Sequence, residues 1–186
     1  MDAIAVLKHD HRTVDELFSK FEKAGPRAYA TKRKVVDRII RELSIHAAIE
    51  ERIFYPAVRH TLEQTEDQVL EALEEHHLVK LTLAELEKLD ARDERFDAKV
   101  TVLIENVRHH VKEEEGEMFP TVRKGVTPSS LRQLGEDLQR AKGSVPDRPH
   151  PNAPDESPAN ALASAGAMVL DGAKDAASAL VGKLSG

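Results

Sequence analysis

Two segments of the chain carry the same pair of potential metal ligands, a histidine followed four residues later by a glutamate. His46 is followed by Glu50, and His110 is followed by Glu114. Because residues i and i+4 lie on one face of a helix, each pair presents an imidazole and a carboxylate about one turn apart. These two ligand types together suit borderline divalent ions, and carboxylate favours iron or manganese over copper. The spacing therefore predicts metal binding.

The two segments belong to an internal repeat. The sequence HAAIEERIFYP, which begins at His46, matches HVKEEEGEMFP, which begins at His110, at an offset of 64 and with a proline six residues after each glutamate. Upstream, His11 matches His77 more loosely, at an offset of 66. Each half of the repeat therefore supplies one single histidine and one histidine–glutamate pair, which indicates a two-fold duplication.

Apolar residues recur at spacings of three and four around each of these ligands, which places all of them on core-facing helix stripes. Two buried carboxylates repel each other and lose their hydration, and the stripes provide no lysine or arginine partner. Two metal ions would neutralise both carboxylates and bind all four imidazoles. The predicted metal ligands are His11, His46, Glu50, His77, His110 and Glu114.

The sequence leaves some of these assignments open. His76 could replace its neighbour His77, although the apolar stripe of leucines favours His77. His109 and Glu113 form another pair with the same spacing, but helical phase and the proline alignment favour His110. His9, His60 and His109 fall off the stripes and are expected to be solvated or to lie beside the ligands.

Three further side chains are candidates for supporting roles. Glu51 and Glu115 are more often exposed at such positions, but each could accept a hydrogen bond from a ligand imidazole. Tyr55 could place its hydroxyl near the metal as a redox or hydrogen-bonding group, although ordinary packing is the more common role of such a tyrosine. The residues themselves identify no catalytic side chain beyond the metal centre.

The elements that must position these residues are helices. The pattern predicts helices over about 2–24, from about 31 through 57, from the capping-box sequence at 65–68 to about 89, over about 96–123, and a short fifth helix from Thr127 to about Ala141. Long helices joined by short loops predict an all-α, antiparallel up-down four-helix bundle.

Proline divides the chain into three parts. Residues 1–143 form the predicted bundle domain, with the metal motifs within 1–123, and residues 144–158 form a Pro-rich linker expected to be extended and exposed. Residues 159–186 form an Ala/Gly-rich tail with a helical stripe of small residues. The tail could mediate self-association or a protein contact, could lie on a membrane surface, or could remain without fixed structure.

Composition excludes several classes of function. The chain of 186 residues has no cysteine, which rules out disulfides, thiolate catalysis and Cys-ligated metal centres. A net charge of −6 with seven aromatic residues argues against nucleic-acid binding. No apolar run approaches the length of a transmembrane helix, and the first residues lack the pattern of a secretory signal. A cytoplasmic protein is expected.

The order of one histidine, one HxxxE pair, a second histidine and a second HxxxE pair resembles the hemerythrin-like, or HHE cation-binding, family over about residues 1–123. The resemblance implies a non-haem di-iron centre with an oxo or hydroxo bridge, in which Glu50 and Glu114 bridge the irons. It implies that His11 and His46 bind one iron, and that His77 and His110 bind the other.

The sequence departs from the family's oxygen carriers at one position. These carriers have a further histidine one turn before the third-helix ligand, and the corresponding residue here is Leu73. The set therefore resembles the four-histidine, actinobacterial type. This resemblance implies reaction with hydrogen peroxide in a catalase-like manner during oxidative stress. The alternatives it leaves are binding or sensing of O2 or NO, and iron handling without turnover.

Overall fold

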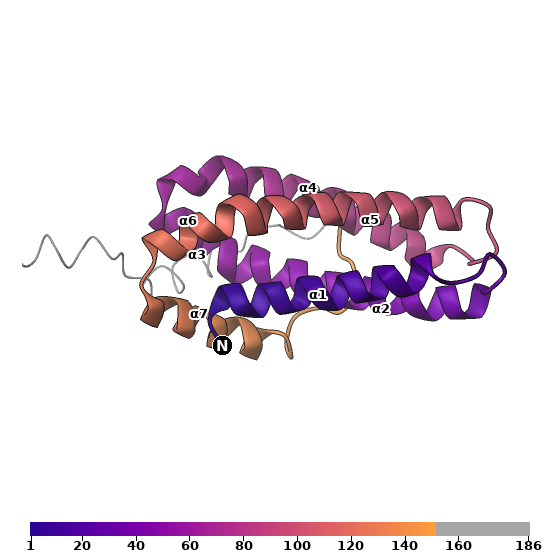
Figure 1. The fold of residues 1–186 in the computed structure, drawn as a ribbon, viewed down its shortest axis with the longest axis horizontal. Helices are drawn as coiled ribbons and strands as arrows, with labels where there is room; N and C mark the ends of the chain where they lie inside the picture. The colour runs from indigo at the N-terminus through magenta and orange to yellow at the C-terminus, as the bar shows by residue number, and fades with distance from the viewer. Residues whose placement is uncertain (152–186) are drawn as a thin grey trace, which may run out of the picture.

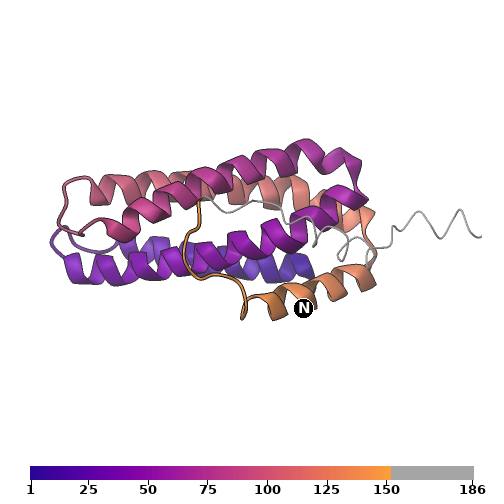
Figure 2. The same ribbon diagram turned by 180° about the vertical axis from the view of Figure 1, so that it is seen from behind.

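The computed structural model describes residues 1–151, and the predicted tail lies outside them. Four long helices run antiparallel as an elongated bundle, as Figures 1 and 2 show from opposite sides. They are α1 (Ala3–Glu22), α2 (Tyr29–Ile49), α4 (Glu66–Lys88) and α5 (Phe96–Glu113). Helix α1 packs on α2, and α4 packs on α5 and α2. The all-α bundle prediction is confirmed.

Helices α2 and α5 do not end at their glutamates but continue through a wider, π-helical turn. These turns are η1 (Glu50–Phe54) and η3 (Glu114–Met118), and they lead into the short helices α3 (Tyr55–Thr61) and α6 (Phe119–Gly125). In each turn a backbone N–H donates to the carbonyl five residues earlier, to that of Glu50 or Glu114. The proline that follows lacks an N–H and crowds the carbonyl four residues before it, which favours the wider turn.

The predicted helix starts are close to those observed. The Asp2 side chain accepts a hydrogen bond of 2.8 Å from the Ala5 N–H at the start of α1. Helix α7 (Pro128–Ala141) is the predicted fifth helix, and Thr127 caps it by accepting from the Ser130 N–H. Helix α4 follows the short turn η2 (Glu63–Thr65), but the Thr65 hydroxyl donates to the Leu62 carbonyl instead of capping the helix.

Helix α7 lies beside the N-terminal part of α1 and also contacts η1 (Figure 1). Gly135 allows this close approach, because a Cβ atom at that position would lie 2.3 Å from the Met1 carbonyl oxygen. The apolar face of α7 buries Leu131, Leu134 and Leu138 against the bundle. This end of the bundle is therefore closed on the α1 side.

The core consists of two apolar clusters with a polar layer between them. One cluster joins α7 and the short helices to the start of α1, where Leu7 is fully buried. The other begins at Val14 and Val79 and continues to the far end of the bundle around Phe18 and Phe96. Histidines from all four long helices and glutamates from the two π turns occupy the layer between the clusters. Burial of the two clusters fixes the heights at which those side chains meet.

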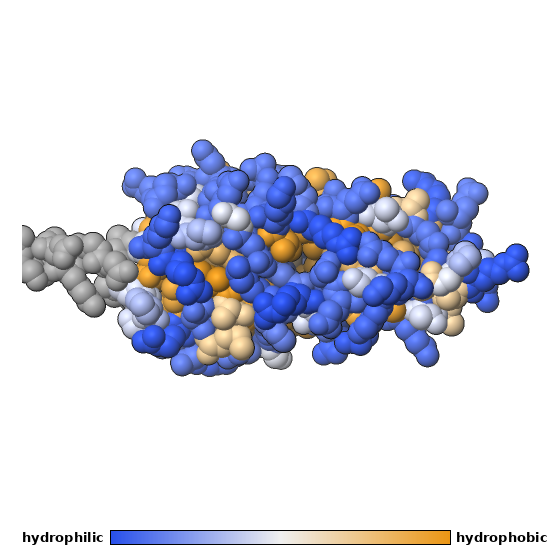
Figure 3. Space-filling model, in the orientation of Figure 1, coloured by the Kyte–Doolittle hydropathy of each residue, from blue (hydrophilic) through white to orange (hydrophobic). Residues whose placement is uncertain are grey.

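The first part of the Pro-rich segment has no regular secondary structure, but it is not free in solvent. Pro149 is buried, and Arg148 Nη1 lies 2.5 Å from Glu87 Oε1 on α4. Residues 146–150 thus lie along a groove between α2 and α4. The outer surface in Figure 3 is mostly hydrophilic with smaller apolar areas. Within residues 1–151, no helix combines the length and apolar character that a membrane span needs.

Candidate metal centre

Six buried side chains from all four long helices and their π turns converge in the polar layer. None of them is more than 5% exposed. Their possible ligand atoms form two groups that share Glu50: one adds His11, His46 and Glu114, and the other adds His76 and His110. Within each group the atoms lie within 4.8 Å of one another. The cluster therefore offers two neighbouring positions for a metal ion.

The structure places His76, the alternative that the sequence left open, in the cluster in place of His77. His76 is 4% exposed, whereas His77 is only partly buried. The leucines that favoured His77 are misleading, since Leu70 and Leu81 are 43% and 40% exposed. The buried face of α4 instead carries smaller residues beside His76, including Val79. Five of the six predicted residues lie in the cluster. The sixth, His77, is adjacent in sequence to His76, which takes its place.

Each imidazole directs its Nδ1 atom outward to a carboxylate. His11 Nδ1 donates to Glu115 at 2.8 Å, and His76 Nδ1 donates to Glu51 at 3.0 Å. The same atom of His110 donates to Glu75 at 2.7 Å, and that of His46 faces Asp10 at 3.6 Å. An ionised carboxylate only accepts hydrogen bonds, so it fixes the proton on Nδ1 and leaves the Nε2 lone pair free. This is the usual arrangement around a metal-binding histidine.

The Nε2 atoms then point inward at one another. His11 Nε2 lies 3.2 Å from His46 Nε2, and His76 Nε2 lies 3.2 Å from His110 Nε2. Because the Nδ1 atoms of His76 and His110 both donate to carboxylates, this pair brings two Nε2 lone pairs together. Neither oxygen of Glu50 has a hydrogen-bond partner among the described residues, although Oε2 lies 3.1 Å from His46 Nε2. Converging lone pairs and unpaired carboxylate oxygens fit a bound cation, which accepts electron density from all of them.

The outer carboxylates also reveal a closer internal symmetry than the sequence showed. His11 and His76 are separated by 65 residues, and so are the carboxylates before them, Asp10 and Glu75. The two π turns contribute an equivalent pair, since Glu51 bonds the histidine of α4 and Glu115 bonds that of α1. The supporting role considered for Glu51 and Glu115 is thus observed. A constant spacing between the acid–histidine pairs was the signal that could have identified His76.

The aromatic residue after each π turn breaks the symmetry. Tyr55 is 1% exposed and its hydroxyl donates to Glu114 Oε1 at 2.9 Å, while lying 3.4 Å from His76 Nε2. Its counterpart Phe119 stacks on the His11 ring with a centroid separation of 5.8 Å. One half of the cluster therefore has a phenol at the ligands where the other has only a hydrocarbon ring.

The electrostatics of the cluster reflect burial and mutual repulsion. Burial, with the charge of Glu114 beside it, raises the pKa of Glu50 well above its ordinary value. Burial acts on Glu114 as well, but the imidazoles of His110 and His11 outweigh it and lower the pKa of this carboxyl. Burial lowers the pKa of His46 to about 4 and also lowers that of His76. Without a cation, burial and mutual repulsion therefore favour the protonated form of Glu50 and the ionised form of Glu114.

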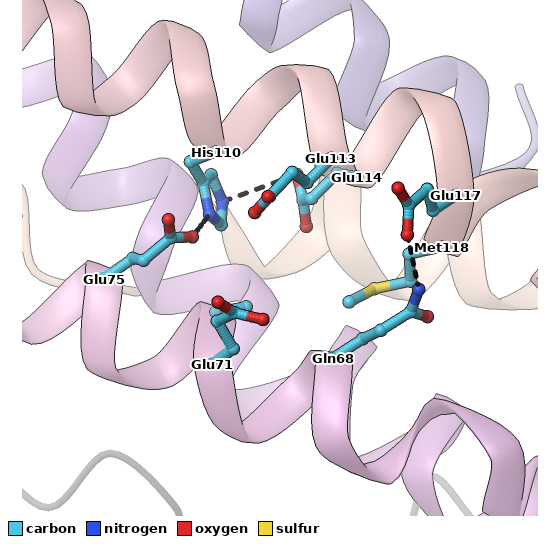
Figure 4. A pocket seen from close by; sticks show the side chains of 9 residues that line it. Gln68, Glu71, Glu75, His110, Glu113, Glu114, Glu117 and Met118 are labelled. Carbon is cyan, nitrogen blue, oxygen red and sulfur yellow. Dashed lines mark hydrogen bonds and ion pairs between the residues drawn. The ribbon is translucent and has the colours of Figure 1, made fainter.

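Two pockets of different character reach the cluster. One, of about 20 Å³, is almost entirely apolar and is lined by the four imidazoles together with aliphatic side chains such as Val14 and Val107. The other, of about 60 Å³, lies between α4 and α5 and is shown in Figure 4. Its wall includes several glutamates, and His110 and Glu114 lie at its inner end. The centre is thus accessible from an acidic side.

Comparison with known proteins agrees with this geometry. A sequence model of the hemerythrin HHE cation-binding domain matches residues 2–122. The chain therefore belongs to the hemerythrin HHE cation-binding family, and the clustered histidines and glutamates are its candidate metal ligands. All six metal ligands predicted from the sequence, from His11 to Glu114, lie within residues 2–122.

Relatives support the same assignment at the level of fold. An uncharacterised hemerythrin-like protein of Schizosaccharomyces pombe is 26% identical over 89% of this chain and 81% of its own length. A DNA nickase of a Nostoc species is 24% identical over 77% of this chain. The matched part covers only 40% of the nickase. A solved HHE cation-binding-domain protein from Mycobacterium kansasii has a TM-score of 0.66 and 24% identity, covering 77% of this chain and 86% of its own.

The family's oxygen carriers have a further histidine one turn before the third-helix ligand. If that ligand is His76 and not His77, the corresponding position in this chain also shifts by one residue. One turn before His76 the chain has Ala72, not the Leu73 expected from the sequence. Ala72 is 4% exposed and lines the acidic pocket beside Glu114. A methyl group thus stands where the carriers have an imidazole, and the space beside it remains part of the pocket.

Proposed function

We propose that the chain is a non-haem di-iron protein that decomposes hydrogen peroxide in a catalase-like reaction, with His76 taking the place of His77 among the six ligands. His11 and His46 would hold one iron, His76 and His110 the other, and Glu50 and Glu114 would bridge them. The observation that carries the proposal is the inward convergence of four Nε2 atoms on two buried carboxylates. Six nitrogen and oxygen ligands in two sets suit two iron ions.

In this reaction one peroxide takes up two electrons and two protons to give two waters, and a second releases two electrons and two protons to give O2. A pair of iron ions, when bound, supplies the reservoir for those two electrons. The Tyr55 hydroxyl donates a hydrogen bond to Glu114 Oε1, so it keeps a transferable proton inside the cluster. The small side chain of Ala72 leaves room for peroxide in the pocket that Glu114 also lines.

The carboxylates around the cluster hold the ligands in place during such a reaction. Glu115 and Glu51 accept the Nδ1 protons of His11 and His76, which keeps the Nε2 atoms directed inward. Lys8 lies 3.0 Å from Glu115, and Lys80 lies 3.1 Å from Glu51. These ion pairs help to hold the carboxylates of Glu115 and Glu51 against the imidazoles that they orient.

A second candidate function is the binding or sensing of O2 or NO. The apolar pocket of about 20 Å³ favours it, because a diatomic gas is small and needs few polar partners. All four imidazoles line this pocket, so a gas held there would be in contact with the ligands. The phenol at Glu114 favours peroxide instead, since proton transfer is required for turnover but not for binding a gas. Iron handling without turnover has no specific support from the geometry.

Addition of peroxide to iron-loaded protein, with an oxygen electrode, tests the proposal. Peroxide decomposition predicts release of one O2 for every two peroxides consumed, over many turnovers. Tyr55→Phe should keep the iron content and slow O2 release, since the ring is kept and the proton is lost. Stoichiometric iron with negligible O2 release would refute the proposal and favour gas binding. His60→Ala is the control, because His60 is an exposed residue outside the cluster.

A further inference from the structure

The two halves of the repeat differ most in what lies outside the cluster. Adding 65 to a residue of α1, or 64 to a residue of α2 and η1, gives its counterpart in the other half. The α1–η1 side has apolar side chains at the outer positions, and helix α7 covers them. The corresponding positions of the α4–η3 side are polar, and the acidic pocket lies there. The pairs are Ala3 and Gln68, Val6 and Glu71, Ile49 and Glu113, and Ile53 and Glu117.

The replacement of apolar side chains by polar ones follows the burial of each position. Val6 and Ile49 are at most 2% exposed and pack in the same cluster as Leu134 of α7. Their counterparts Glu71 and Glu113 line a pocket that leads to the ligands. One side of the metal centre is therefore sealed by hydrocarbon, and the other is open and lined by carboxylates.

We propose that the pocket between α4 and α5 is the passage through which divalent metal, Fe²⁺ in particular, reaches the buried ligands. This inference rests on the metal site of the proposed function and adds its route of loading. Four glutamates surround the pocket, and Glu114 lies at its inner end (Figure 4). The four are Glu71, Glu75, Glu113 and Glu117.

The inner end of the passage points to a cation as its occupant. Glu114 is 2% exposed and lines the pocket, and its Oε2 atom receives no hydrogen bond among the described residues. A pocket of about 60 Å³ has room for a cation with several of its waters. A buried carboxylate with one oxygen lacking a hydrogen-bond partner, at the end of an acidic pocket, attracts cations and repels anions.

The rim of the passage has a place where a cation could pause. Glu75, His109 and Glu113 bring one ligand atom each within 4.8 Å of one another, and His109 Nε2 lies 3.2 Å from Glu113 Oε1. Glu75 also accepts the Nδ1 proton of His110, so it joins the rim to the inner ligands. A metal ion at the rim would then lie next to the histidine that binds it inside.

The test measures the rate of metal loading, not activity. Metal-free protein is mixed with Fe²⁺ without oxygen, and unbound Fe²⁺ is followed over time with a chelating dye. Glu71→Gln with Glu117→Gln removes two charges from the mouth but no proposed ligand, and Glu105→Gln with Glu136→Gln removes two exposed charges elsewhere as a matched control. Steering by a charged cleft changes association rates by about 10-fold to 10³-fold at low ionic strength.

We expect the mouth variant to load about tenfold more slowly than the wild type at low salt, with a weaker salt dependence and the same final metal content. The control should load at the wild-type rate. Equal rates in wild type, mouth variant and control would overturn the inference while leaving the metal site intact. A mouth variant that loads normally but consumes peroxide more slowly would also overturn it, because the passage would then serve the oxidant. Failure of the wild type to bind metal would instead refute the proposed function.

Discussion

Replacing Glu50 by methionine should stabilise the metal-free protein while removing its response to metal. Glu50 is fully buried and neither of its oxygens has a hydrogen-bond partner in the described residues. An unsatisfied buried polar group costs about 1–3 kcal/mol, and methionine has a similar length without that cost. In a bundle of this size each kcal/mol moves the melting temperature by about 2–4 °C. The metal-free variant should therefore melt roughly 2–12 °C above the metal-free wild type.

Metal should reverse this order. A metal ion at a hundredfold excess over its Kd stabilises the wild type by about 2.7 kcal/mol, whereas the variant lacks the shared ligand of both groups and gains much less. Thermal unfolding followed by circular dichroism, with and without Fe²⁺ under nitrogen, measures both effects. Glu105→Met on the exposed face of α5 is the control and should change neither. A metal-free Glu50→Met protein that melts below the metal-free wild type would refute the reasoning.

Three other predictions follow from the same structure. His76→Ala should lower the metal content and His77→Ala should leave it unchanged; elemental analysis that finds the reverse would restore His77 as the ligand. As pH rises above the ordinary glutamate range, the metal-free protein should lose stability by up to about 1.4 kcal/mol per unit for each proton, because burial raises the pKa of Glu50 and the unfolded chain releases this proton at a lower pH than the folded chain. His110 acts in the same direction, because the charge of Glu114 outweighs burial and raises the pKa of this imidazole. Urea unfolding at about pH 7 and about pH 8.5 measures the change, and an equal free energy of unfolding at both pH values would contradict these pKa shifts. Gly135→Ala should destabilise the fold by about 1–3 kcal/mol in urea unfolding, because the added Cβ meets the α1 backbone, whereas Gly116→Ala has open space and should be neutral or stabilising.

The sequence predicted the bundle because its helices carry strong periodic stripes and clear stop signals. Gly25 and Pro26 end the first helix region, and Thr127 with Pro128 starts α7 where expected. The π turns were not predicted, although the proline six residues after each glutamate is their cause. A pattern at helical spacing does not distinguish a continuous α-helix from one with a single wider turn.

The choice between His76 and His77 required the structure. Helix α4 has apolar residues on two faces, and periodicity alone favoured the larger leucines, whereas packing against α5 and α2 buries the face with Ala72 and Val79. The hydroxyl contact of Tyr55 could not be predicted either, since its position at Glu114 depends on how η1 meets η3. Helix–helix geometry decides such contacts, and spacing along one helix does not contain that information.

The number of metal ions bound at saturation tests the central claim most directly. Titration of metal-free protein with Fe²⁺ under nitrogen, followed by elemental analysis after removal of excess metal, measures it. Two overlapping ligand groups that share Glu50 predict two ions per chain. One ion or none in correctly folded protein would contradict the account, because the inward-facing imidazoles and the unpaired carboxylate oxygens would then have another cause.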